Sequence, residues 1–382
     1  MPRYIGLDLH RDYVVGCEFT PGADPGQQER HFRYPTTPDG WSRVFTHLGG
    51  DALVAIEVTG NAFNVYDSLL GHAQEVLVAN PLAMKRLGSG KHTDKEDSAR
   101  LAKMLALGTL PTVWVPPQPV REVRRLLGAR ERMLSMRTAA VNQAKAVLRR
   151  RGIASGRMRH DPSVLKELPP DERILYTAAL SQVASLDKTI HDLEAEIALR
   201  LKDDEAFGHL LTITGVGATT AAIVWATIGD PGRFKTGKQV ARYAGLDPSV
   251  MQSGETDRRG RISKNGSRRL RTALVEVAHT IGRLEQGYLG MWYRARASQK
   301  GKAKTAVALA RKLVVVAWRL MLRGEDYRTV RTDRFEVKRK EVERLAGERA
   351  DWDALADKVT EAFTSRARRG QIGRKGPARK AG

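Results

Sequence analysis

Four acidic residues near the N-terminus have the types and the spacing to do chemistry. Asp8 lies in YIGLDLH and Glu57 lies in LVAIEVTGN, each at the end of a short apolar run that is typical of a strand. Asp94 and Asp97 lie three residues apart in HTDKEDSARLA, at the start of a helical pattern, so their carboxylates share one helix face. Because two strand ends and one helix start can converge on a point, we expect a cluster of carboxylate oxygens there.

Phosphoryl transfer is the chemistry that such a cluster serves. Two Mg²⁺ or Mn²⁺ ions about 4 Å apart activate an attacking oxygen and stabilise the leaving one. These hard cations prefer carboxylate oxygens, and Mg²⁺ keeps several waters, so three or four acids suffice. We expect Asp8 to bridge the ions, with Glu57 beside it and Asp94 and Asp97 closing the site. Each acid alone has an ordinary explanation, since a strand-end Asp often forms a turn and Asp94 could cap its helix.

Two histidines and three further acids lie close to these positions in the sequence. His10 and His92 flank the expected site and could touch a phosphate or a leaving oxygen, although a structural role is the simpler interpretation of each. Asp12, Asp67 and Glu96 are interpreted as surface or turn residues. None of them is needed to complete the expected metal site.

The charge of the whole chain points to a polyanionic partner. Its 382 residues include 65 Lys and Arg against 43 Asp and Glu, with a net charge of +22 and a pI of about 10.3. Nucleic acid is the simplest such partner, and a solvated basic surface is the alternative. The single cysteine, Cys17, excludes an intramolecular disulfide framework and a cysteine-rich zinc site, and it fits a reducing cytosol.

Nothing in the sequence predicts a membrane protein. No signal peptide is evident at the N-terminus. The most apolar segment, TAVALARKLVVVAWRLML, contains Arg311, Lys312 and Arg319, so it predicts a core helix and not a membrane span. We therefore expect a protein of the prokaryotic cytosol or nucleoid with no membrane partner.

The elements that must position the acids form a mixed α/β domain. RYIGLDLH, YVVGCEF and ERHFRYP predict three hairpin-linked strands, and alternating helices and strands follow them. This order is the one found in the ribonuclease H-like fold. The usual acidic positions of that fold are the first strand, the end of the fourth strand and a late helix, where Asp8, Glu57 and the Asp94–Asp97 pair lie.

The middle of the chain predicts two long charged helices, within residues 119–207. In the second helix Val183, Leu186, Ile190, Leu193 and Ile197 keep the three-and-four spacing of a coiled-coil seam. Two heptads leave two arrangements open. The seam could pair with another subunit, or the two helices could form an antiparallel hairpin within one chain.

The third block is mainly helical and strongly basic. Its Gly215-Val216-Gly217 turn resembles a helix-hairpin-helix, whose amides can approach a phosphate backbone; a tight structural turn is the equal alternative. GLDPSVMQSGETDRRGRISKNG predicts a basic loop, and RARRGQIGRKGPARKAG predicts a disordered tail. Trp225, Tyr243 and Trp292 lie on helical patterns and are expected in the core. The expected phosphate-contacting cations are Arg258, Arg259, Arg261, Lys264, Arg268, Arg269 and Arg271.

The chain resembles the DEDD transposases of the IS110 class, a family that includes the Piv-type DNA invertases. The matching N-terminal pieces are GLDLH, AIEVTGN, NPLAMKRL with GKHTDKEDSARLA, and VWVPP. The C-terminal match is the run TGVGATTAAIVWATIGDPGRFKTGKQVARYAGLDPSVMQSGETDRRGRISKNGSRRLR. Together these pieces cover most of residues 1–285, in a specific order and spacing.

The resemblance implies both an architecture and a mechanism. It implies a RuvC-like (ribonuclease H-like) catalytic domain over residues 1–118, a helical linker over 119–207 and a transposase domain over 208–330, followed by a basic extension and tail over 331–382. It implies Asp8, Glu57, Asp94 and Asp97 as the metal-binding tetrad. It also implies a guide RNA encoded by the element, recombination by a dimer or tetramer, and a catalytic serine in the second domain.

The serine that fits the resemblance best is Ser253, in Gln-Ser-Gly ahead of the GRISKNG run. Its hydroxyl would form a covalent phosphoserine with DNA and so conserve bond energy for rejoining. Ser249 is the competing candidate and Ser263 a more distant one. Such a serine would have to be delivered to the acids from another domain or another subunit, which makes the expected active site composite.

The leading hypothesis is therefore a DNA transposase or recombinase with a DEDD metal site and a serine nucleophile. One alternative is a metal-dependent Holliday-junction resolvase or nuclease that hydrolyses DNA with water. Another is a non-catalytic nucleic-acid-binding protein, such as an architectural protein or an RNA chaperone. An actin-like ATPase also opens with GLD on a strand, but the sequence has no second Gly-rich phosphate loop and no P-loop.

Overall fold

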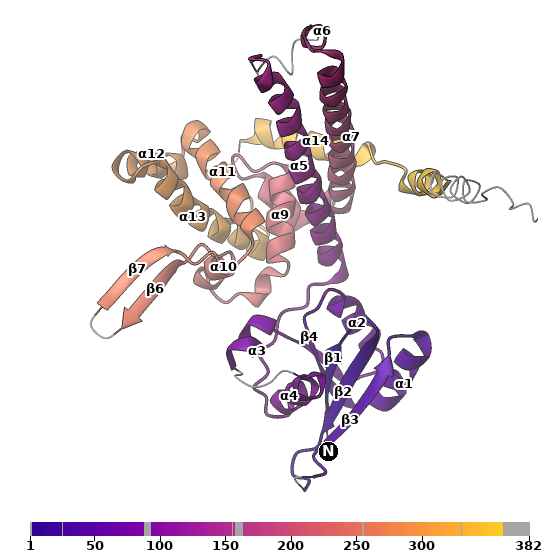
Figure 1. Cartoon of the computed structure of the whole chain (residues 1–382). Coiled ribbons are helices and arrows are strands. Elements are labelled where there is room, and N and C mark those ends of the chain that lie inside the picture. The colour runs from indigo at the N-terminus through magenta and orange to yellow at the C-terminus, as the bar shows by residue number, and fades with distance from the viewer. Residues whose placement is uncertain are drawn as a thin grey trace, which may run out of the picture. The chain divides into compact units, whose positions relative to one another are not determined.

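The chain divides between Pro116 and Pro117 into an N-terminal α/β unit and a C-terminal, mainly helical unit, in this computed structural model (Figure 1). The structure describes residues 2–24, 26–87, 93–154, 156, 163–253, 256–329 and 331–361, and for residues 250–253 and 256–259 it describes the backbone alone. The predicted tail beyond residue 361 and His92 lie outside the described residues. No helix among the described residues is long and apolar enough to cross a membrane.

The N-terminal unit is built on a five-stranded sheet with the order β3-β2-β1-β4-β5. β2 runs antiparallel to β1 and β3, whereas β4 runs parallel to β1 and β5. The prediction of a mixed α/β domain that opens with three hairpin-linked strands is confirmed. The elements of this unit are β1 (Arg3–Leu9), β2 (Tyr13–Phe19), β3 (Glu29–Pro35), α1 (Pro38–Leu48), β4 (Ala52–Glu57), α2 (Ala62–Leu69), β5 (Glu75–Ala79), α3 (Pro81–Leu87) and α4 (Asp94–Ala106).

The sheet has a different apolar core on each face, because side chains alternate along a strand. On one face Ile5, Leu7 and Ile56 pack with α1 and α2. On the other face Ala55 and Ala79 pack with Met84 of α3 and with α4. The N-terminal unit is thus a three-layer structure in which α4 packs against β1 on the second face.

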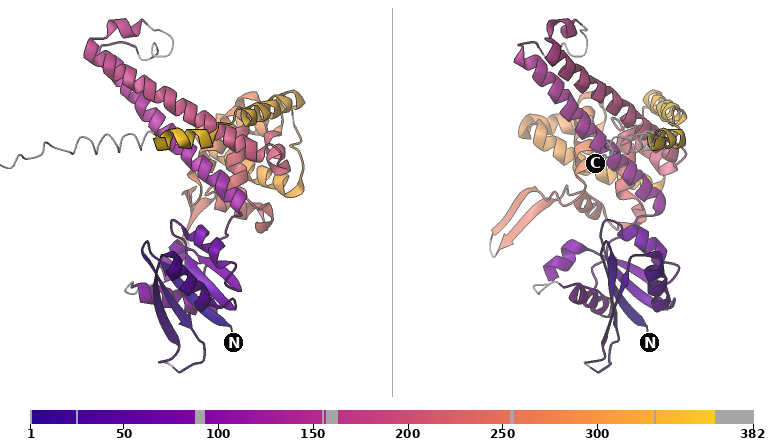
Figure 2. Two further views of the ribbon diagram at one scale, coloured as in Figure 1. Left: turned by 90° about the vertical axis from the view of Figure 1, so that its right-hand side faces the viewer. Right: turned by 45° about the vertical axis from the view of Figure 1, so that its right-hand side comes forward.

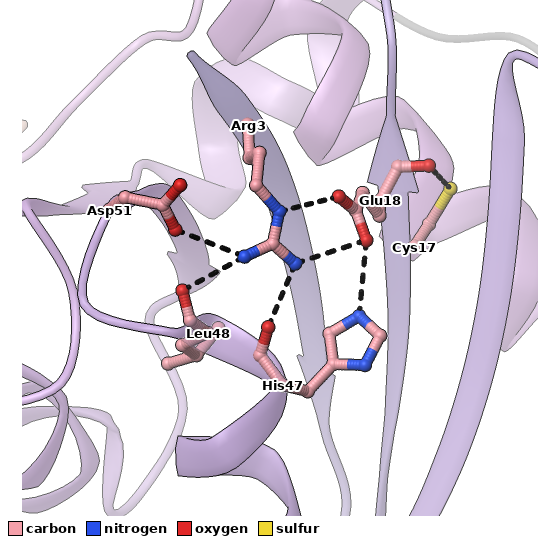
Figure 3. A network of polar contacts seen from close by, with 6 residues as sticks. All are labelled: Arg3, Cys17, Glu18, His47, Leu48 and Asp51. Atoms are coloured by element: carbon pink, nitrogen blue, oxygen red, sulfur yellow. Dashed lines mark hydrogen bonds and ion pairs between the residues drawn. The ribbon is translucent and has the colours of Figure 1, made fainter. Parts of the chain in front are cut away.

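A polar network fixes the first residue of β1 (Figure 3). The Arg3 guanidinium donates to both carboxylate oxygens of Glu18, at 2.7 and 3.3 Å, and to Oδ1 of Asp51 at 3.0 Å. It also donates to the backbone oxygens of His47 and Leu48 at the end of α1. Cations favour a helix C-terminus, and Arg3 joins the C-terminus of α1 to the end of β1 that is opposite Asp8.

The helical unit begins with the two long helices that the sequence predicts. α5 (Gln118–Arg150) and α7 (Pro170–Leu201) lie side by side and antiparallel, joined through α6 (Val164–Glu167), as Figures 1 and 2 show. Within the chain they form a hairpin, which is the second of the two arrangements left open by the seam. Leu186, Ile190, Leu193 and Ile197 are buried there.

The rest of this unit surrounds one large apolar core built by α8, α9, α10, α11 and α13. α14 packs against α7. The remaining elements are α8 (Glu205–Leu211), α9 (Ala218–Ile228), the short 3₁₀ helix η2 (Pro231–Arg233), α10 (Gly237–Tyr243), β6 (Pro248–Ser253), β7 (Thr256–Ile262), α11 (Arg268–Leu284), α12 (Tyr288–Lys300), α13 (Lys302–Arg323) and α14 (Thr332–Gly347).

Two predictions for this unit are wrong in part. The predicted basic loop is an antiparallel hairpin, because β6 and β7 pair from Pro248 with Ile262 to Ser253 with Thr256 (Figure 1). Its many Arg, Ser and Asp residues hide the alternating apolar pattern by which a strand is recognised in a sequence. Of the aromatic residues expected in the core, Trp225 and Trp292 are half-buried and Tyr243 is exposed, since each lies at the edge of its helix packing.

Candidate active site

Asp8 and Glu57 lie at equivalent ends of two neighbouring parallel strands. Leu7 of β1 pairs with Ile56 of β4, so the next residue of each strand is one of the two acids. Side chains two residues apart point to the same face, which places Asp8 with Gly6 and Glu57 with Ala55, on the α4 side of the sheet. The pattern of the sequence predicted the strand ends, and the register brings them together.

Gly6 allows α4 to lie close against β1. A Cβ added at Gly6 would lie 2.1 Å from the backbone oxygen of Ser98 and 2.7 Å from the nitrogen of Ala102. Ser98 is fully buried at this contact. Because only a glycine permits this approach, the first turn of α4 reaches the ends of β1 and β4.

Thr93, and not Asp94, caps α4. Thr93 Oγ1 accepts a hydrogen bond from the backbone N–H of Glu96 at 3.3 Å and donates to the Glu96 carboxylate at 3.0 Å. The two contacts join Glu96 to the N-cap residue Thr93, which gives the surface residue Glu96 a structural role. Asp94 is the first residue of the helix, so the alternative that it acts as the N-cap is wrong.

His10 joins two of the four acids. Its Nε2 lies 2.9 Å from Oδ2 of Asp8 and 3.4 Å from Oδ1 of Asp94. The other oxygen of Asp94 accepts a hydrogen bond from the Tyr13 hydroxyl at 3.0 Å. The Tyr13 ring stacks on His10 with 4.6 Å between centroids, and the Arg33 guanidinium lies 3.7 Å from the centre of the Tyr13 ring. A chain of polar and ring contacts therefore orients Asp94 toward Asp8.

The electrostatics of the cluster disfavour the ionised form of Asp8. Burial is the largest cause of its raised pKa, and the charges of Asp94 and Asp97 raise the pKa further. His10 acts in the opposite direction, through its charge and its hydrogen bond. Since Asp97 acts on Asp8, it lies within electrostatic reach of the cluster. A bound cation would relieve the repulsion among these three acids.

The donor atoms suit a hard divalent cation. Ligand atoms of Asp8, His10 and Asp94 all lie within 4.8 Å of one another. Glu57 and Asp97 provide further carboxylate oxygens nearby, and each already has a polar contact within the protein. Carboxylate oxygens suit Mg²⁺ and Mn²⁺, and an added imidazole nitrogen is compatible with Mn²⁺. The residues present therefore fit a divalent metal ion.

Sequence reasoning did not find Tyr13 and undervalued His10. Tyr13 is the first residue of β2, and the short β1–β2 turn returns it to the end of β1. A polar residue soon after the Asp8 strand was the available signal, but hairpin register is needed to place its side chain.

Comparison with known proteins identifies the family of this chain. A transposase family model named for IS110 and the DEDD acids matches residues 5–152, and the model of the IS116/IS110/IS902 transposase family matches residues 208–289. The chain belongs to the IS110 family of transposases. It is therefore an enzyme that cuts and rejoins DNA.

Three relatives illustrate the breadth of the similarity. The transposase for insertion sequence element IS1111A of Coxiella burnetii is 26% identical over 338 residues, which span 85% of this chain and 91% of that protein. The Sinorhizobium fredii protein y4rJ is 30% identical over 287 residues, 66% of this chain and 72% of that protein. The pilin gene-inverting protein of Moraxella bovis is 26% identical over 343 residues, 85% of this chain and 97% of that protein.

The three serines considered in the transposase all lie near the β6–β7 hairpin. Ser253 is the last residue of β6. The Ser249 hydroxyl donates to the backbone oxygen of Arg261 at 2.8 Å, and the Ser263 hydroxyl donates to Oδ1 of Asp247 at 2.5 Å. Ser249 and Ser263 thus have structural partners, and the side chain of Ser253 lies outside the described residues.

The expected phosphate-contacting residues of the transposase separate into two groups. Arg269 forms an ion pair with Glu131 of α5, and Arg271 donates to the backbone oxygens of Ala244 and Gly266. These two arginines therefore have partners within the helical unit. The exposed cations of the set are Arg261, Lys264 and Arg268; the side chains of Arg258 and Arg259 on β7 lie outside the described residues.

The Gly215–Gly217 turn joins α8 to α9. Gly215 has φ +78°, a conformation that favours glycine, and an added Cβ would lie 3.0 Å from the Thr280 side chain on α11. Gly217 is the N-cap of α9, and space beside it is open. Packing thus explains Gly215, whereas a phosphate contact at Gly217 stays a prediction.

Proposed function

We propose that this transposase cleaves and rejoins DNA at a divalent-metal site formed by Asp8, Glu57, Asp94 and Asp97, with Ser253 as the nucleophile. The single observation that carries the proposal is the adjacency of Asp8 and Glu57 on parallel strands, with Asp94 joined to Asp8 through His10. Strand order and acid positions also favour a ribonuclease H-like (RuvC-like) fold for residues 1–116. Mg²⁺ or Mn²⁺ bound there would stabilise the charge that develops on the oxygens of the reacting phosphate.

The residues of the chain divide the remaining work. His10 Nε2 makes a hydrogen bond with Oδ2 of Asp8, and the Tyr13 hydroxyl donates a hydrogen bond to Oδ2 of Asp94. These contacts hold the two carboxylates in place. Such supporting partners fix the orientation of metal-binding side chains. The raised pKa of Asp8 also means that a proton competes with a cation for this carboxylate at acidic pH.

In the proposed cleavage step the Ser253 hydroxyl oxygen attacks phosphorus. A phosphorus–Oγ bond forms, one bridging P–O bond of the DNA breaks, the hydroxyl proton passes to a base or to solvent, and the departing deoxyribose oxygen takes up a proton. One phosphodiester replaces another, so no external energy source is required. The reverse step with a different deoxyribose hydroxyl rejoins the strands.

The partners that we propose are DNA, a guide RNA and further copies of the chain. The net charge of +22 supports a polyanionic partner, and Arg261, Lys264 and Arg268 are exposed near the hairpin that carries Ser253. Recombination requires several strand cuts in concert, which favours a dimer or tetramer. The name of the pilin gene-inverting relative fits the same class of reaction.

The proposal is tested with two variants of the full chain and a DNA substrate that carries the element ends. Asp8→Asn is expected to abolish cleavage while DNA binding is retained, and wild-type activity is expected to require Mg²⁺ or Mn²⁺. Ser253→Ala is expected to eliminate the covalent protein–DNA adduct detected on denaturing gels. Recombination at normal rates without Asp8 would refute the metal site. Free 5′-phosphate ends without any adduct would indicate a hydrolytic nuclease instead, and persistent adducts in Ser253→Ala would assign the nucleophile to another residue.

A further inference from the structure

A second basic surface lies in the helical unit, between α12, α13 and the start of α10. It lines a groove of about 1190 Å³, and most of its residues lie beyond position 289, where the family match ends. Its cationic residues are Lys238, Arg296, Arg311, Lys312, Arg319, Arg323 and Arg328. We call it the α12–α13 groove.

The cations of α13 form one face of that helix. Arg311, Val315, Arg319 and Arg323 recur every four residues, with Lys312 and Val316 beside them. The opposite face, with Leu309, Leu313 and Ala317, is buried in the core. Arg311, Lys312 and Arg319 therefore line an open groove, in which their aliphatic side-chain stems lie between the charged groups.

Most of the cations that line the groove are not neutralised by an ion pair in the described part of the chain. Lys238, Arg296, Arg311, Lys312 and Arg319 form no ion pair with any carboxylate in the described part of the chain. The two acids at its rim already have partners, since Asp326 binds His209 at 2.7 Å and Glu325 lies 3.9 Å from Arg323. Several uncompensated cations in one groove repel one another, and a polyanion would relieve that repulsion.

Trp292 gives the groove an aromatic surface. Its ring is half-buried, with Lys312 Nζ at 5.0 Å and the Arg296 guanidinium carbon at 5.6 Å from the ring centre. Tyr288, one helical turn earlier, also lines the groove and is 66% exposed. Aromatic rings interleaved with flexible cations are the features with which proteins bind single-stranded nucleic acid, because bases stack while phosphates meet the cations.

We propose that the α12–α13 groove binds a single-stranded polynucleotide, with a base stacked on Trp292 and its phosphates contacted by Arg311, Lys312 and Arg319. The volume supports a polymer segment, since small-molecule pockets occupy about 300–1,000 Å³. A base can stack on Trp292 only if it is unpaired. The groove therefore favours a single strand over a duplex, whose bases are already stacked on one another. The inference rests on the proposed function only in that this transposase handles nucleic acid.

The test measures binding by the full chain in EDTA, so that cleavage does not contribute. Three fluorescein-labelled probes of one mixed sequence are compared by anisotropy, namely a 20-nucleotide RNA, the corresponding single-stranded DNA and the 20-base-pair duplex. Arg311→Gln/Arg319→Gln is expected to weaken binding of a single strand about 25-fold near 0.1 M salt and to lower the salt slope by about 1.4, since each phosphate contact contributes about 0.7. Trp292→Leu is expected to weaken it about tenfold, and Trp292→Phe far less.

Arg334→Gln/Lys340→Gln is the matched control, because it removes two charges from the exposed face of α14. It should change binding less than threefold, and all variants should melt like the wild type. Stronger binding of RNA would identify an RNA strand as the occupant, and equal or stronger binding of single-stranded DNA would identify a DNA strand; both outcomes support the groove. Wild-type affinity in both groove variants, or losses confined to the duplex, would overturn it while leaving the proposed function intact. A wild-type chain that binds neither single-stranded probe would also overturn the groove, whereas the proposed function is decided separately by cleavage of the element ends in Mg²⁺ or Mn²⁺.

Discussion

The Nε2 atom of His10 lies 2.9 Å from Oδ2 of Asp8, and His10 lowers the pKa of this carboxyl, whereas burial and two neighbouring acids raise it. The same nitrogen lies 3.4 Å from Oδ1 of Asp94. His10 thus compensates a cluster of negative charge that the fold of the N-terminal unit creates. The arrangement sacrifices stability at the site, as is common where charges are gathered for chemistry.

Asp8→Asn is expected to stabilise the protein in the absence of metal. Because the pKa of Asp8 is raised in the folded state, the folded chain holds more protons than the unfolded chain between the ordinary pKa of 3.8 and the raised value. Stability therefore falls as pH rises through that window, and the cost persists at pH 7. In EDTA at pH 7 the variant should melt about 2 °C higher than the wild type, and the gap should narrow toward pH 4.

Asp12→Asn provides the control for this comparison, since Asp12 lies close in sequence and its side chain is 84% exposed. It should leave the melting temperature unchanged at every pH. Mg²⁺ or Mn²⁺ should raise the melting temperature of the wild type and of Asp12→Asn, but much less that of Asp8→Asn. A lower melting temperature for Asp8→Asn at pH 7 would show that this carboxylate stabilises the fold.

Tyr13→Phe is expected to weaken metal binding without unfolding the unit. The variant keeps the ring that stacks on His10 and removes the hydroxyl that donates to Asp94 at 3.0 Å. Loss of a partner that orients a metal-binding side chain reduces metal affinity by about 10- to 100-fold. Calorimetric titration with Mn²⁺ measures the effect. Tyr34→Phe on β3 removes a hydroxyl elsewhere in the sheet and should bind Mn²⁺ normally; equal affinities in both variants would exclude an orienting role for Tyr13.

Sequence patterns predicted the elements of the N-terminal unit better than they predicted its contacts. The apolar runs around Asp8 and Glu57 identify two strand ends, and the Asp94–Asp97 spacing identifies a helix start. The Leu7–Ile56 register that makes Asp8 and Glu57 neighbours depends on pairing between distant segments, which no local pattern contains.

The helical unit shows a second limit of sequence reasoning. The seam through Leu186 and Ile190 shows which face of α7 is apolar, but only the structure shows that α5 and α14 pack against α7. Trp292 occupies a helical position like that of a core residue, yet it is only half-buried and lines the α12–α13 groove. A periodic pattern identifies a buried face and does not identify what buries it.

Gly6→Ala is expected to damage both the fold and the site. The added Cβ would lie 2.1 Å from the backbone oxygen of Ser98, so α4 must move away from β1. Overpacking of this kind costs about 1–3 kcal/mol, and the shift would displace Asp94 and Asp97 from Asp8. We expect a lower melting temperature and loss of cleavage. Gly71→Ala is the control, because a Cβ added at Gly71 would have nothing within 4 Å; normal activity in Gly6→Ala would contradict the close approach of α4.

Glu18→Gln is expected to make the N-terminal unit less stable and less sensitive to acid. The Arg3 hydrogen bonds lower the pKa of Glu18, so its contribution to stability is present above the ordinary value of 4.5 and is lost as pH falls through the lowered value. Burial lowers the pKa of His47 below 6.5, so neutral His47 also loses stability on acidification. At pH 7 the variant should lose about 1.5–3 kcal/mol, the range for a hydrogen bond to a charged group. Its remaining acid dependence should lie below pH 6.5, where His47 titrates.

Asp51→Asn removes the partner of Arg3 that is 64% exposed and should cost less than about 0.5 kcal/mol. If the two variants lost equal stability in urea denaturation at pH 7, the Arg3–Glu18 pair would not be the stabilising contact of this network.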